Sequence, residues 1–335
     1  MDAETIKDAM LAGGESWRAA RSHCRGPEAP LSKGDYSETQ LSERDLSECD
    51  FTESDFYEVD FTRANLKKSI FVHADLTSAK MTQAALYKAD LTGAIFQEAT
   101  LAKSDLSSST CKGADFRGAD LSGVNFTGAD LREADFSHAD LTGANLTRAN
   151  ITGAKFHFTQ MSDVNVTHLA YGNYRDMVGL YYGVRGIDLI YGNAIYLRDA
   201  KDQDYIDTLH QVLLDKEPGM WRAMDLFLFK SWGLIDHGRS LLKVAFYAFV
   251  IATFYGLIYS MDMIYGWQIM DYSNSAKTWF TPFYYSVVTY TTLGFGDVTA
   301  DSLFGEIFVI SEVIFGYFTL GLLLAILANT IARRS

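Results

Sequence analysis

The segment ADLREADFSHADLTGANLTRANI, residues 129–151, repeats one motif every five residues. Each unit places a small residue, an Asp or Asn, and a large apolar residue in succession. The large apolar position recurs from Leu41 to Met161, and every such position except Cys111 holds Leu, Phe, Ile or Met. The repeat therefore extends far beyond this segment and accounts for most of the first half of the chain.

A period of five residues matches neither an α-helix, with 3.6 residues per turn, nor a β-strand, with a period of two. It does match a solenoid in which each unit forms one side of a four-sided coil, with apolar residues stacked inside and polar residues in the turns. The pattern resembles that of the pentapeptide-repeat family, over roughly residues 36–168. The resemblance implies a right-handed quadrilateral β-helix, with about six coils spaced by ~4.8 Å.

Acidic residues gather in the first part of this repeat. By resemblance to the gyrase-binding members of the family, they would form an acidic ladder that imitates the phosphates of DNA. The alternative is a solvated outer face, which we favour because basic residues end the acidic run at Arg63, Lys67 and Lys68. The glutamates occupy one position of five consecutive units: Glu38, Glu43, Glu48, Glu53 and Glu58.

The average composition of the 335 residues hides a division between two kinds of sequence. Residues 1–170 carry 26 acidic and 17 basic side chains, whereas residues 241–335 carry only ten charged side chains. The net charge of −13 and the lack of a basic stripe argue against a nucleic-acid partner, because phosphates are bound by basic side chains. No catalytic triad, pair of catalytic carboxylates or metal cluster stands out, so we expect no enzyme activity and no cofactor.

The three cysteines, Cys24, Cys49 and Cys111, lack the spacing of a metal site or a disulfide framework. Met1 is followed by acidic residues rather than by a signal peptide, so we expect the polar half to stay in the reducing cytoplasm. This expectation excludes a secreted enzyme. Cys49 and Cys111 fall on inward positions of the repeat, where we expect them to be core residues.

The linker after the repeat contains two helical patterns. Apolar residues at helical spacing predict an amphipathic helix at residues 205–213. The aromatic stretch Trp221–Trp232 suits a helix in the headgroup region of a membrane, the alternative being a helix packed on the rod. The chain thus divides into an N-terminal segment 1–35, a pentapeptide-repeat β-helix 36–170, a linker 171–240 with amphipathic or interfacial helices, and a transmembrane pore domain 241–335.

Two stretches of the last part are long and apolar enough to cross a membrane. We expect an outer helix at 241–263 and an inner helix at 303–331; 19 residues at ~1.5 Å each already span about 29 Å. Basic residues precede the first span at Arg222, Lys230 and Arg239, lie near its start at Lys243, and follow the second span at Arg333 and Arg334. The positive-inside rule then places both termini in the cytoplasm, as expected of a multi-pass protein of the cell membrane.

The segment between the two spans carries the most specific motif. Thr281 is expected to cap a short helix at 282–290, with Pro282 at its first position. A short helix, a glycine-rich loop and a long inner helix in this order resemble the pore module of potassium channels, over about residues 241–335. The loop reads Thr291-Thr292-Leu293-Gly294-Phe295-Gly296-Asp297.

The resemblance implies a selectivity filter at residues 292–296. In such filters backbone carbonyls replace the water around K⁺, and glycines permit the backbone conformations that align those carbonyls. Each chain supplies one loop, so four chains are needed to close the ring, and Asp297 would place acidic groups at the outer mouth. Leu293 and Phe295 replace the more usual Val or Ile and Tyr, but both contribute backbone carbonyls. The expected K⁺ ligands belong to Thr292, Leu293, Gly294 and Phe295, and Gly296 completes the filter.

The inner helix contains further candidate residues. Gly316 aligns with the hinge glycine of the family, although close helix packing explains a membrane glycine equally well. An acidic residue at Glu312 is costly inside a membrane helix and is often functional. We expect it to hydrogen-bond the back of the pore helix, replacing the glutamate that some relatives carry where this chain has Val288. By the same resemblance, the residues that line the cavity and gate are Tyr317, Leu320, Leu324 and Ala328.

Together these features predict a homotetrameric potassium-selective channel that conducts K⁺ passively across the cell membrane. The repeat domain would be cytoplasmic and would order the tetramer, sense a ligand or dock a protein partner, with the first of these roles favoured. Two alternatives stay open: a non-selective monovalent cation channel, and an acidic repeat module that the apolar helices merely anchor to the membrane. The gating stimulus cannot be read from these residues.

Overall fold

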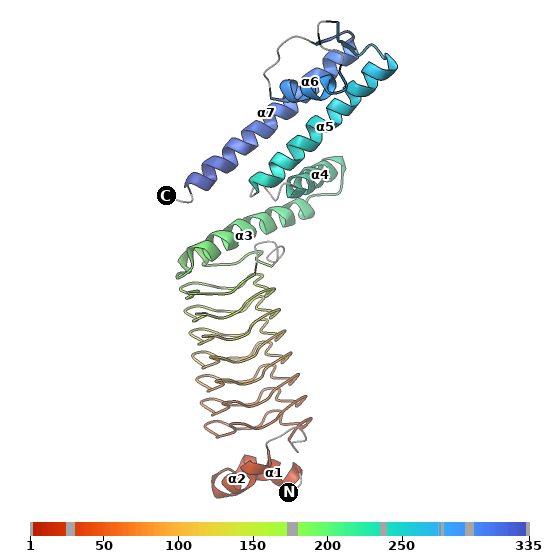
Figure 1. The fold of residues 1–335 in the computed structure, drawn as a ribbon. Coiled ribbons are helices and arrows are strands. Elements are labelled where there is room, and N and C mark those ends of the chain that lie inside the picture. The colour runs from red at the N-terminus through yellow and green to blue at the C-terminus, as the bar shows by residue number, and fades with distance from the viewer. Residues whose placement is uncertain are drawn as a thin grey trace. The chain divides into compact units, whose positions relative to one another are not determined.

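The computed structural model divides the chain into two compact units, Met1–Val212 and Leu213–Ser335. The first is a stack of coils between terminal helices, and the second is helical (Figure 1). The structure describes residues 3–24, 31–172, 180–234, 240–273, 275, 278–291 and 298–332.

The first unit is the quadrilateral β-helix that the five-residue period predicts. Bridges join residues 20 positions apart in parallel, as in Asp115↔Asp135, so four five-residue units complete one coil. Phe116 N donates to the carbonyl of Asp135 at 2.8 Å, and Asp135 N donates to the carbonyl of Ala114 at 3.0 Å. Each coil thus satisfies the backbone groups of its neighbours, which lets the stack extend without long strands.

Large side chains fill the interior of the coils. Phe116 is fully buried, and its ring lies 4.9 Å from that of Phe96 and 5.2 Å from that of Phe136. All three belong to one column, because residues 20 apart occupy the same side of successive coils. The large and small apolar positions therefore form the continuous core that the sequence pattern predicts.

The β-helix continues beyond residue 170, the limit suggested by the five-residue spacing. Asn165 bridges Tyr191 across 26 positions, so the last coil is longer than the others and its sequence loses the period. Helix α3 (Ala194–Asp215) closes this end and buries Tyr196 in the core (Figure 1). The carboxylate of Asp207 on α3 accepts a hydrogen bond from the backbone N of Tyr181 at 3.2 Å.

Helices α1 (Ala3–Ala12) and α2 (Gly14–Ala20) close the other end, followed by the 3₁₀ turn η1 (Arg21–His23). Trp17 is buried, and its indole N donates to the carbonyl of Asp45 at 2.5 Å. Arg44 reaches back to the carbonyl of Leu11 at 2.9 Å. These contacts cover the apolar core where the first coil would otherwise expose it to water.

The N-terminal cap corrects the expectation for two of the cysteines. Cys24 and Cys49 are joined by a disulfide, and their Cα atoms lie 5.0 Å apart. Both are buried, so Cys49 is a core residue as expected, but neither is an unpaired thiol. Their spacing of 25 residues is no recognisable framework; the pairing arises because the cap folds back onto the first coils. Disulfides are rare in a reducing cytoplasm, so counting the free thiols of the protein is a direct test of this pairing.

Cys111 is a free, fully buried cysteine at a large inward position. Burial raises the pKa of its thiol to about 12, so almost none is thiolate at neutral pH. We predict that iodoacetamide labels no cysteine in the native, unreduced protein and one cysteine after denaturation. Counting labelled thiols by mass spectrometry tests both statements. Three labelled cysteines in the denatured, unreduced protein would contradict the disulfide.

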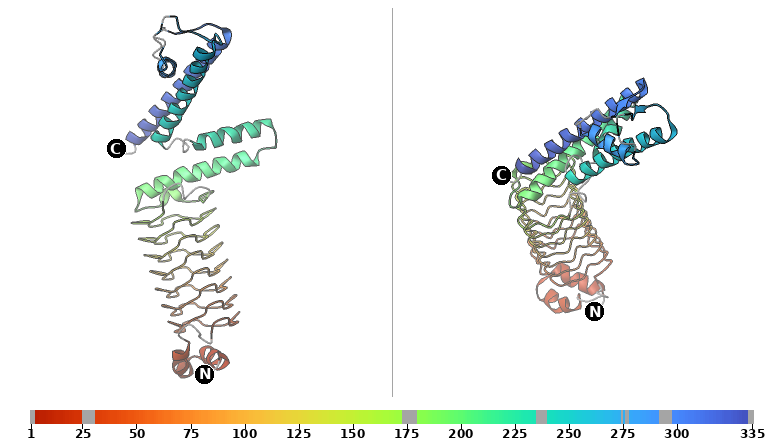
Figure 2. Two further views of the ribbon diagram at one scale, coloured as in Figure 1. Left: turned by 45° about the vertical axis from the view of Figure 1, so that its right-hand side comes forward. Right: turned by 45° about the horizontal axis from the view of Figure 1, so that its top comes forward.

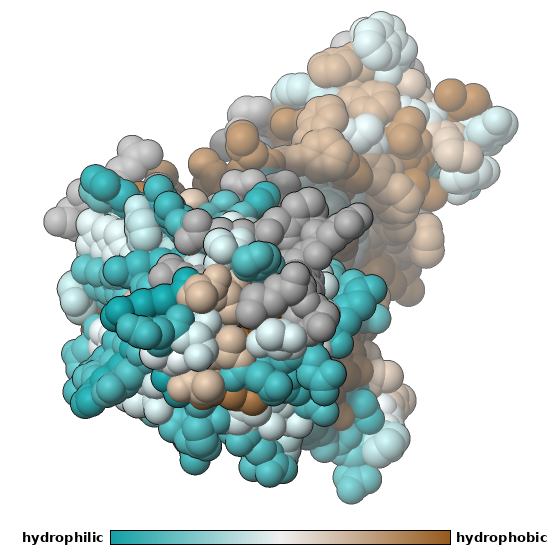
Figure 3. Space-filling view, turned by 90° about the horizontal axis from the view of Figure 1, so that it is seen from below, coloured by the Kyte–Doolittle hydropathy of each residue, from teal (hydrophilic) through white to brown (hydrophobic). Residues whose placement is uncertain are grey.

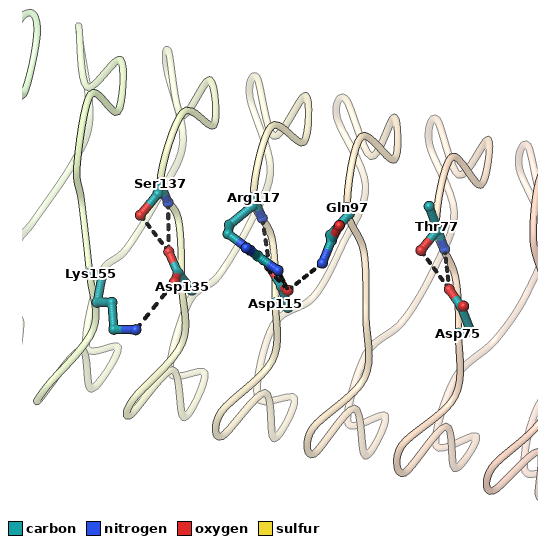
Figure 4. Close-up of polar contacts among 8 residues, drawn as sticks. All are labelled: Asp75, Thr77, Gln97, Asp115, Arg117, Asp135, Ser137 and Lys155. Atoms are coloured by element: carbon teal, nitrogen blue, oxygen red, sulfur yellow. Dashed lines mark hydrogen bonds and ion pairs between the residues drawn. The ribbon is translucent and has the colours of Figure 1, made fainter.

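The outer face of the rod is organised by the Asp and Asn of each unit. Asp75 accepts hydrogen bonds from the backbone N and hydroxyl of Thr77, at 2.9 and 2.6 Å, which fixes the turn between two sides of the coil (Figure 4). Two coils further along the rod, Asp115 accepts hydrogen bonds from the backbone N and the side chain of Arg117. It also accepts one from the side chain of Gln97 at 2.7 Å (Figure 4). The polar positions of the repeat therefore serve its turns.

The glutamates of the acidic run do not form a single ladder. The coil repeats every 20 residues, so units five residues apart lie on successive sides of the rod. Glu43 lies 3.5 Å from Arg63, and Glu48 lies 3.6 Å from Lys68, each pair joining neighbouring coils. This arrangement supports the solvated outer face rather than an imitation of DNA.

The carboxylates of these turns predict an acid limit to the stability of the rod. Burial alone would raise the pKa of Asp115, but hydrogen bonds from Arg117 and Gln97 outweigh it and lower the pKa. The side chain of Arg132 likewise lowers the pKa of Asp130. A pKa lowered by folding stabilises the folded state above the unfolded value of about 4, and this contribution is lost as the pH falls through the folded values. We expect the thermal unfolding midpoint of the rod to decrease when the pH is lowered below about 4, and to decrease less in D130N. A wild-type midpoint that does not change below pH 4 would contradict this account.

Candidate functional site: a pore module in the second unit

After the end of α3, the described residues of the second unit form four helices and a two-stranded pairing. These elements are α4 (Met220–Leu234), α5 (Leu241–Tyr265), β1 (Met270–Asp271), α6 (Thr281–Tyr290), β2 (Thr299–Ala300) and α7 (Leu303–Ala332). Leu241–Tyr265 and Leu303–Ala328 are long and apolar enough to cross a membrane. They run side by side, with the short helix α6 against both (Figure 2). The helix bounds expected from sequence, 241–263, 282–290 and 303–331, lie within α5, α6 and α7.

Helix α6 begins one residue earlier than expected. Thr281 is its first residue rather than its N-cap, which is Phe280, and Pro282 lies in the first turn. The hydroxyl of Thr281 instead accepts a hydrogen bond from the backbone N of Thr278 at 3.1 Å, outside the helix. With ten residues α6 is about 15 Å long, too short to cross a membrane. The expected filter residues Thr292, Leu293, Gly294, Phe295 and Gly296, and Asp297 after them, lie outside the described residues.

The C-terminal end of α6 rests directly on α7. A Cβ added to Gly316 would lie 1.9 Å from the carbonyl oxygen of Tyr290, the last residue of α6. The hydroxyls of Thr319 and Tyr290 lie 3.0 Å apart, one turn further along α7. Gly316 therefore allows α6 and α7 to pack closely, which is one of the two roles considered for this glycine from the sequence. The other role, a hinge in α7, stays a prediction.

Helix α6 also packs closely on α5. A Cβ added to Gly256 would lie 2.6 Å from the ring of Phe283 and 3.2 Å from its Cα. At the end of α5, the buried carboxylate of Asp262 accepts hydrogen bonds from the backbone N of Ile269 and of Met270, both at 3.0 Å. The segment that leads from α5 to α6 is thus tied to α5, and the pore helix has a fixed position in the unit.

A polar cluster joins all three helices behind α6. Glu312 on α7 is fully buried, and its carboxyl group contacts the hydroxyl of Ser286 on α6 and lies 2.8 Å from the hydroxyl of Tyr259 on α5. Glu312 thus faces the pore helix, and its contact is at Ser286. Val288, two residues further along α6, is buried. Support of the filter by this cluster stays a prediction.

The residues expected to line a cavity and gate are accessible in the single chain. Tyr317, Leu320, Leu324 and Ala328 are all exposed on α7. Leu320 also borders an apolar recess of about 300 Å³ between α5, α6 and α7. Figure 3 shows the contrast between the mostly hydrophilic surface of the repeat unit and the hydrophobic surface of these helices. Such apolar exposure on two long helices suits contact with lipid or with further copies of the chain.

Two long apolar helices packed on a short helix are the arrangement expected of a pore module, here in a chain that also has a β-helix. Comparison with family models agrees. Residues 241–333 match the ion channel family, and stretches between residues 37 and 167 match pentapeptide repeats in eight copies. The chain therefore carries pentapeptide repeats followed by an ion-channel domain, and it is a membrane protein. Both families are non-enzymatic kinds of protein.

Solved structures similar to this chain include pentapeptide-repeat proteins. HetL from the cyanobacterium Nostoc sp. strain PCC 7120 is 20% identical, with 52% of this chain and 92% of HetL covered and a TM-score of 0.24. A trypsin-treated form of QnrB1, a plasmid-mediated fluoroquinolone resistance protein, is 18% identical, with 51% and 86% covered and a TM-score of 0.26. A protein of the Arabidopsis thaliana thylakoid lumen is 24% identical, with 38% and 82% covered and a TM-score of 0.21. No curated protein matches the chain.

Several residues of the module were not found from the sequence. Ser286, Tyr259 and Gly256 carry no special signal, because serine, tyrosine and glycine are common in membrane helices. Asp262 did carry one, since it is an acidic residue near the end of an apolar span. Ser286, Tyr259 and Gly256 are informative because of their partners on neighbouring helices. Asp262 is informative because it binds two backbone N groups of the segment that follows α5.

Proposed function

We propose that this chain is the subunit of a homotetrameric, potassium-selective channel. The observation that carries the proposal is the position of α6. Its last residue, Tyr290, is held against α7, and Thr-Leu-Gly-Phe-Gly-Asp follows almost at once at residues 292–297. A loop that starts from a fixed helix end can aim its carbonyls at a common axis, and four such loops would form the oxygen cage that a dehydrated K⁺ requires.

The C-terminal end of α6 would also favour a cation. The last carbonyls of a helix carry a partial negative charge, and in a tetramer four of these ends would face one central cavity. Exposed apolar residues on α5 and α7 would meet lipid or the neighbouring subunits. Both termini would be cytoplasmic, and K⁺ would be the only ligand, as the permeant ion and not as a cofactor.

The repeat domain is proposed to order the tetramer. Its core is filled by stacked side chains, which leaves little room in the coils for a small ligand. Helix α3 is bonded to the last coil and is followed by α4 and α5, so an arrangement of four rods would be transmitted along the chain to the pore. The second role that we propose for the rod is to bind a cytoplasmic protein partner.

The reversal potential of the purified protein in planar bilayers, with KCl on one side and NaCl on the other, tests the proposal. We expect a reversal potential close to the potassium equilibrium value, and no current from G294D. A reversal near zero with robust current would instead identify a non-selective cation channel. Absence of current from a correctly assembled tetramer, together with an unchanged cellular role of G294D, would favour the membrane-anchored repeat module.

A further inference from the structure

The buried cluster behind the pore helix has a hydrogen-bond problem that the carboxylate form of Glu312 does not solve. The hydroxyl oxygen of Ser286 lies 2.7 Å from the carbonyl oxygen of Ala252 on α5 and also contacts one carboxyl oxygen of Glu312. The other carboxyl oxygen accepts the hydroxyl hydrogen of Tyr259 at 2.8 Å. The side chains of Ser286, Tyr259 and Glu312 are fully buried, so bulk water does not reach them, and the protein itself has to supply the missing donor.

A serine hydroxyl has one hydrogen and can donate only one of these two bonds. The carbonyl of Ala252 is an acceptor and has no hydrogen to give. If Ser286 donates to Ala252, the contact with Glu312 is a hydrogen bond only when the carboxyl group donates. A neutral Glu312 therefore satisfies every contact of the cluster, whereas a carboxylate leaves one of them without a hydrogen.

The charges around the cluster lead to the same answer. In the described parts of α5, α6 and α7, Lys243 is the only basic side chain, and it lies 16 residues before Tyr259, about 24 Å along α5. Among the described residues, the titratable groups that interact with Glu312 are the hydroxyls of Tyr259 on α5 and of Tyr290 on α6. A buried carboxylate without a cation is costly, and this cost favours the neutral acid.

We propose that Glu312 is a neutral carboxylic acid whose O–H donates a hydrogen bond to Ser286, and that the resulting chain of hydrogen bonds from α7 through α6 to α5 positions the pore helix. Glu312 is thus a positioning residue that acts through Ser286. When the proton is lost, Ser286 turns its hydrogen from Ala252 to the carboxylate, and the bond between α6 and α5 breaks. The channel then loses conduction at alkaline pH. This last step rests on the proposed function, whereas the protonation state does not.

Infrared spectroscopy of the purified full-length protein at neutral pH measures the protonation state directly. A protonated carboxyl group has a carbonyl stretch distinct from that of a carboxylate. The difference spectrum between wild type and E312Q is expected to contain this band, and that between wild type and E306Q to lack it. Glu306 is the matched control because it lies on the same helix but is exposed. A neutral-pH spectrum without the band would overturn the proposal whether or not the protein conducts.

The pH profile of the current tests the positioning role. Glutamine imitates the neutral acid, because its amide can donate to Ser286 and accept from Tyr259. We expect the wild-type and E306Q currents to fall roughly tenfold at alkaline pH, the scale of one lost buried hydrogen bond, and the E312Q profile to stay flat. E312A, which can do neither, should assemble poorly. The proposal is wrong if E312Q keeps the wild-type pH dependence or assembles as poorly as E312A.

Discussion

Replacing Gly316 with alanine is expected to destabilise the pore module and to remove most of the current. The added Cβ would lie 1.9 Å from the carbonyl oxygen of Tyr290 and 2.9 Å from its carbonyl carbon. Both are backbone atoms of α6, so relief requires that the whole helix end move away from α7. Overpacking of this kind costs typically ~1–3 kcal/mol, and here it displaces the residue that leads into the proposed filter.

Gly321→Ala is the control, because a Cβ at Gly321 would meet no atom within 4 Å in the described part of the chain. Gly321 lies on the same helix as Gly316, and the two substitutions add the same methyl group. We would compare the yield of assembled protein, its thermal midpoint and the K⁺ flux into liposomes. If G316A matched G321A in stability and flux, the close approach of α6 and α7 would be wrong. If G316A kept its stability but lost flux, the hinge interpretation of Gly316 would gain support.

Replacing Phe116 with alanine is expected to have the largest effect on the repeat domain. Its ring is fully buried between those of Phe96 and Phe136, at 4.9 and 5.2 Å. Removing a buried phenylalanine costs about 3–5 kcal/mol. The surrounding coils are held in register by backbone hydrogen bonds between residues 19 or 21 positions apart, so they cannot close around the cavity without breaking those bonds.

The effect on the rod is measured by the loss of β circular dichroism on heating the full-length protein in detergent. Lys67→Ala is a suitable control, since Lys67 is exposed on the same domain and should change the midpoint little. We expect the F116A midpoint to fall by several degrees or more, given the size of the free-energy loss. Equal midpoints for the two variants would show that the stacked column contributes little to the rod.

Repetition explains how much of the fold could be predicted. The large apolar position that Phe116 occupies recurs in every five-residue unit, so an error in assigning one unit would conflict with the assignment of all the others. The inward-facing column of apolar side chains was therefore predicted correctly. The last coil did not, because its 26-residue step from Asn165 to Tyr191 breaks the period. The acidic run was harder to interpret. Five-residue spacing suggests one ladder, whereas the 20-residue coil distributes Glu43 and Glu48 over different sides.

For the pore module, sequence supplied the order of the parts but not their partners. The motif around Gly294 and the two apolar spans are local patterns that need no knowledge of folding. Glu312 could be singled out as an acidic residue in an apolar helix, but its two contacts, Ser286 and Tyr259, come from other helices. A contact between residues that are 26 or 53 positions apart leaves no local signal.

The β-helix and the two long apolar helices could be predicted from the order of residues, because each is a periodic or local pattern of side-chain chemistry. The folded structure was needed to see that Cys24 pairs with Cys49, that Gly316 lies against Tyr290, and that Glu312 joins three helices. These are contacts between segments distant along the chain. Their existence depends on how closely backbones approach and on which buried groups must share a hydrogen, and neither is specified by residue type alone.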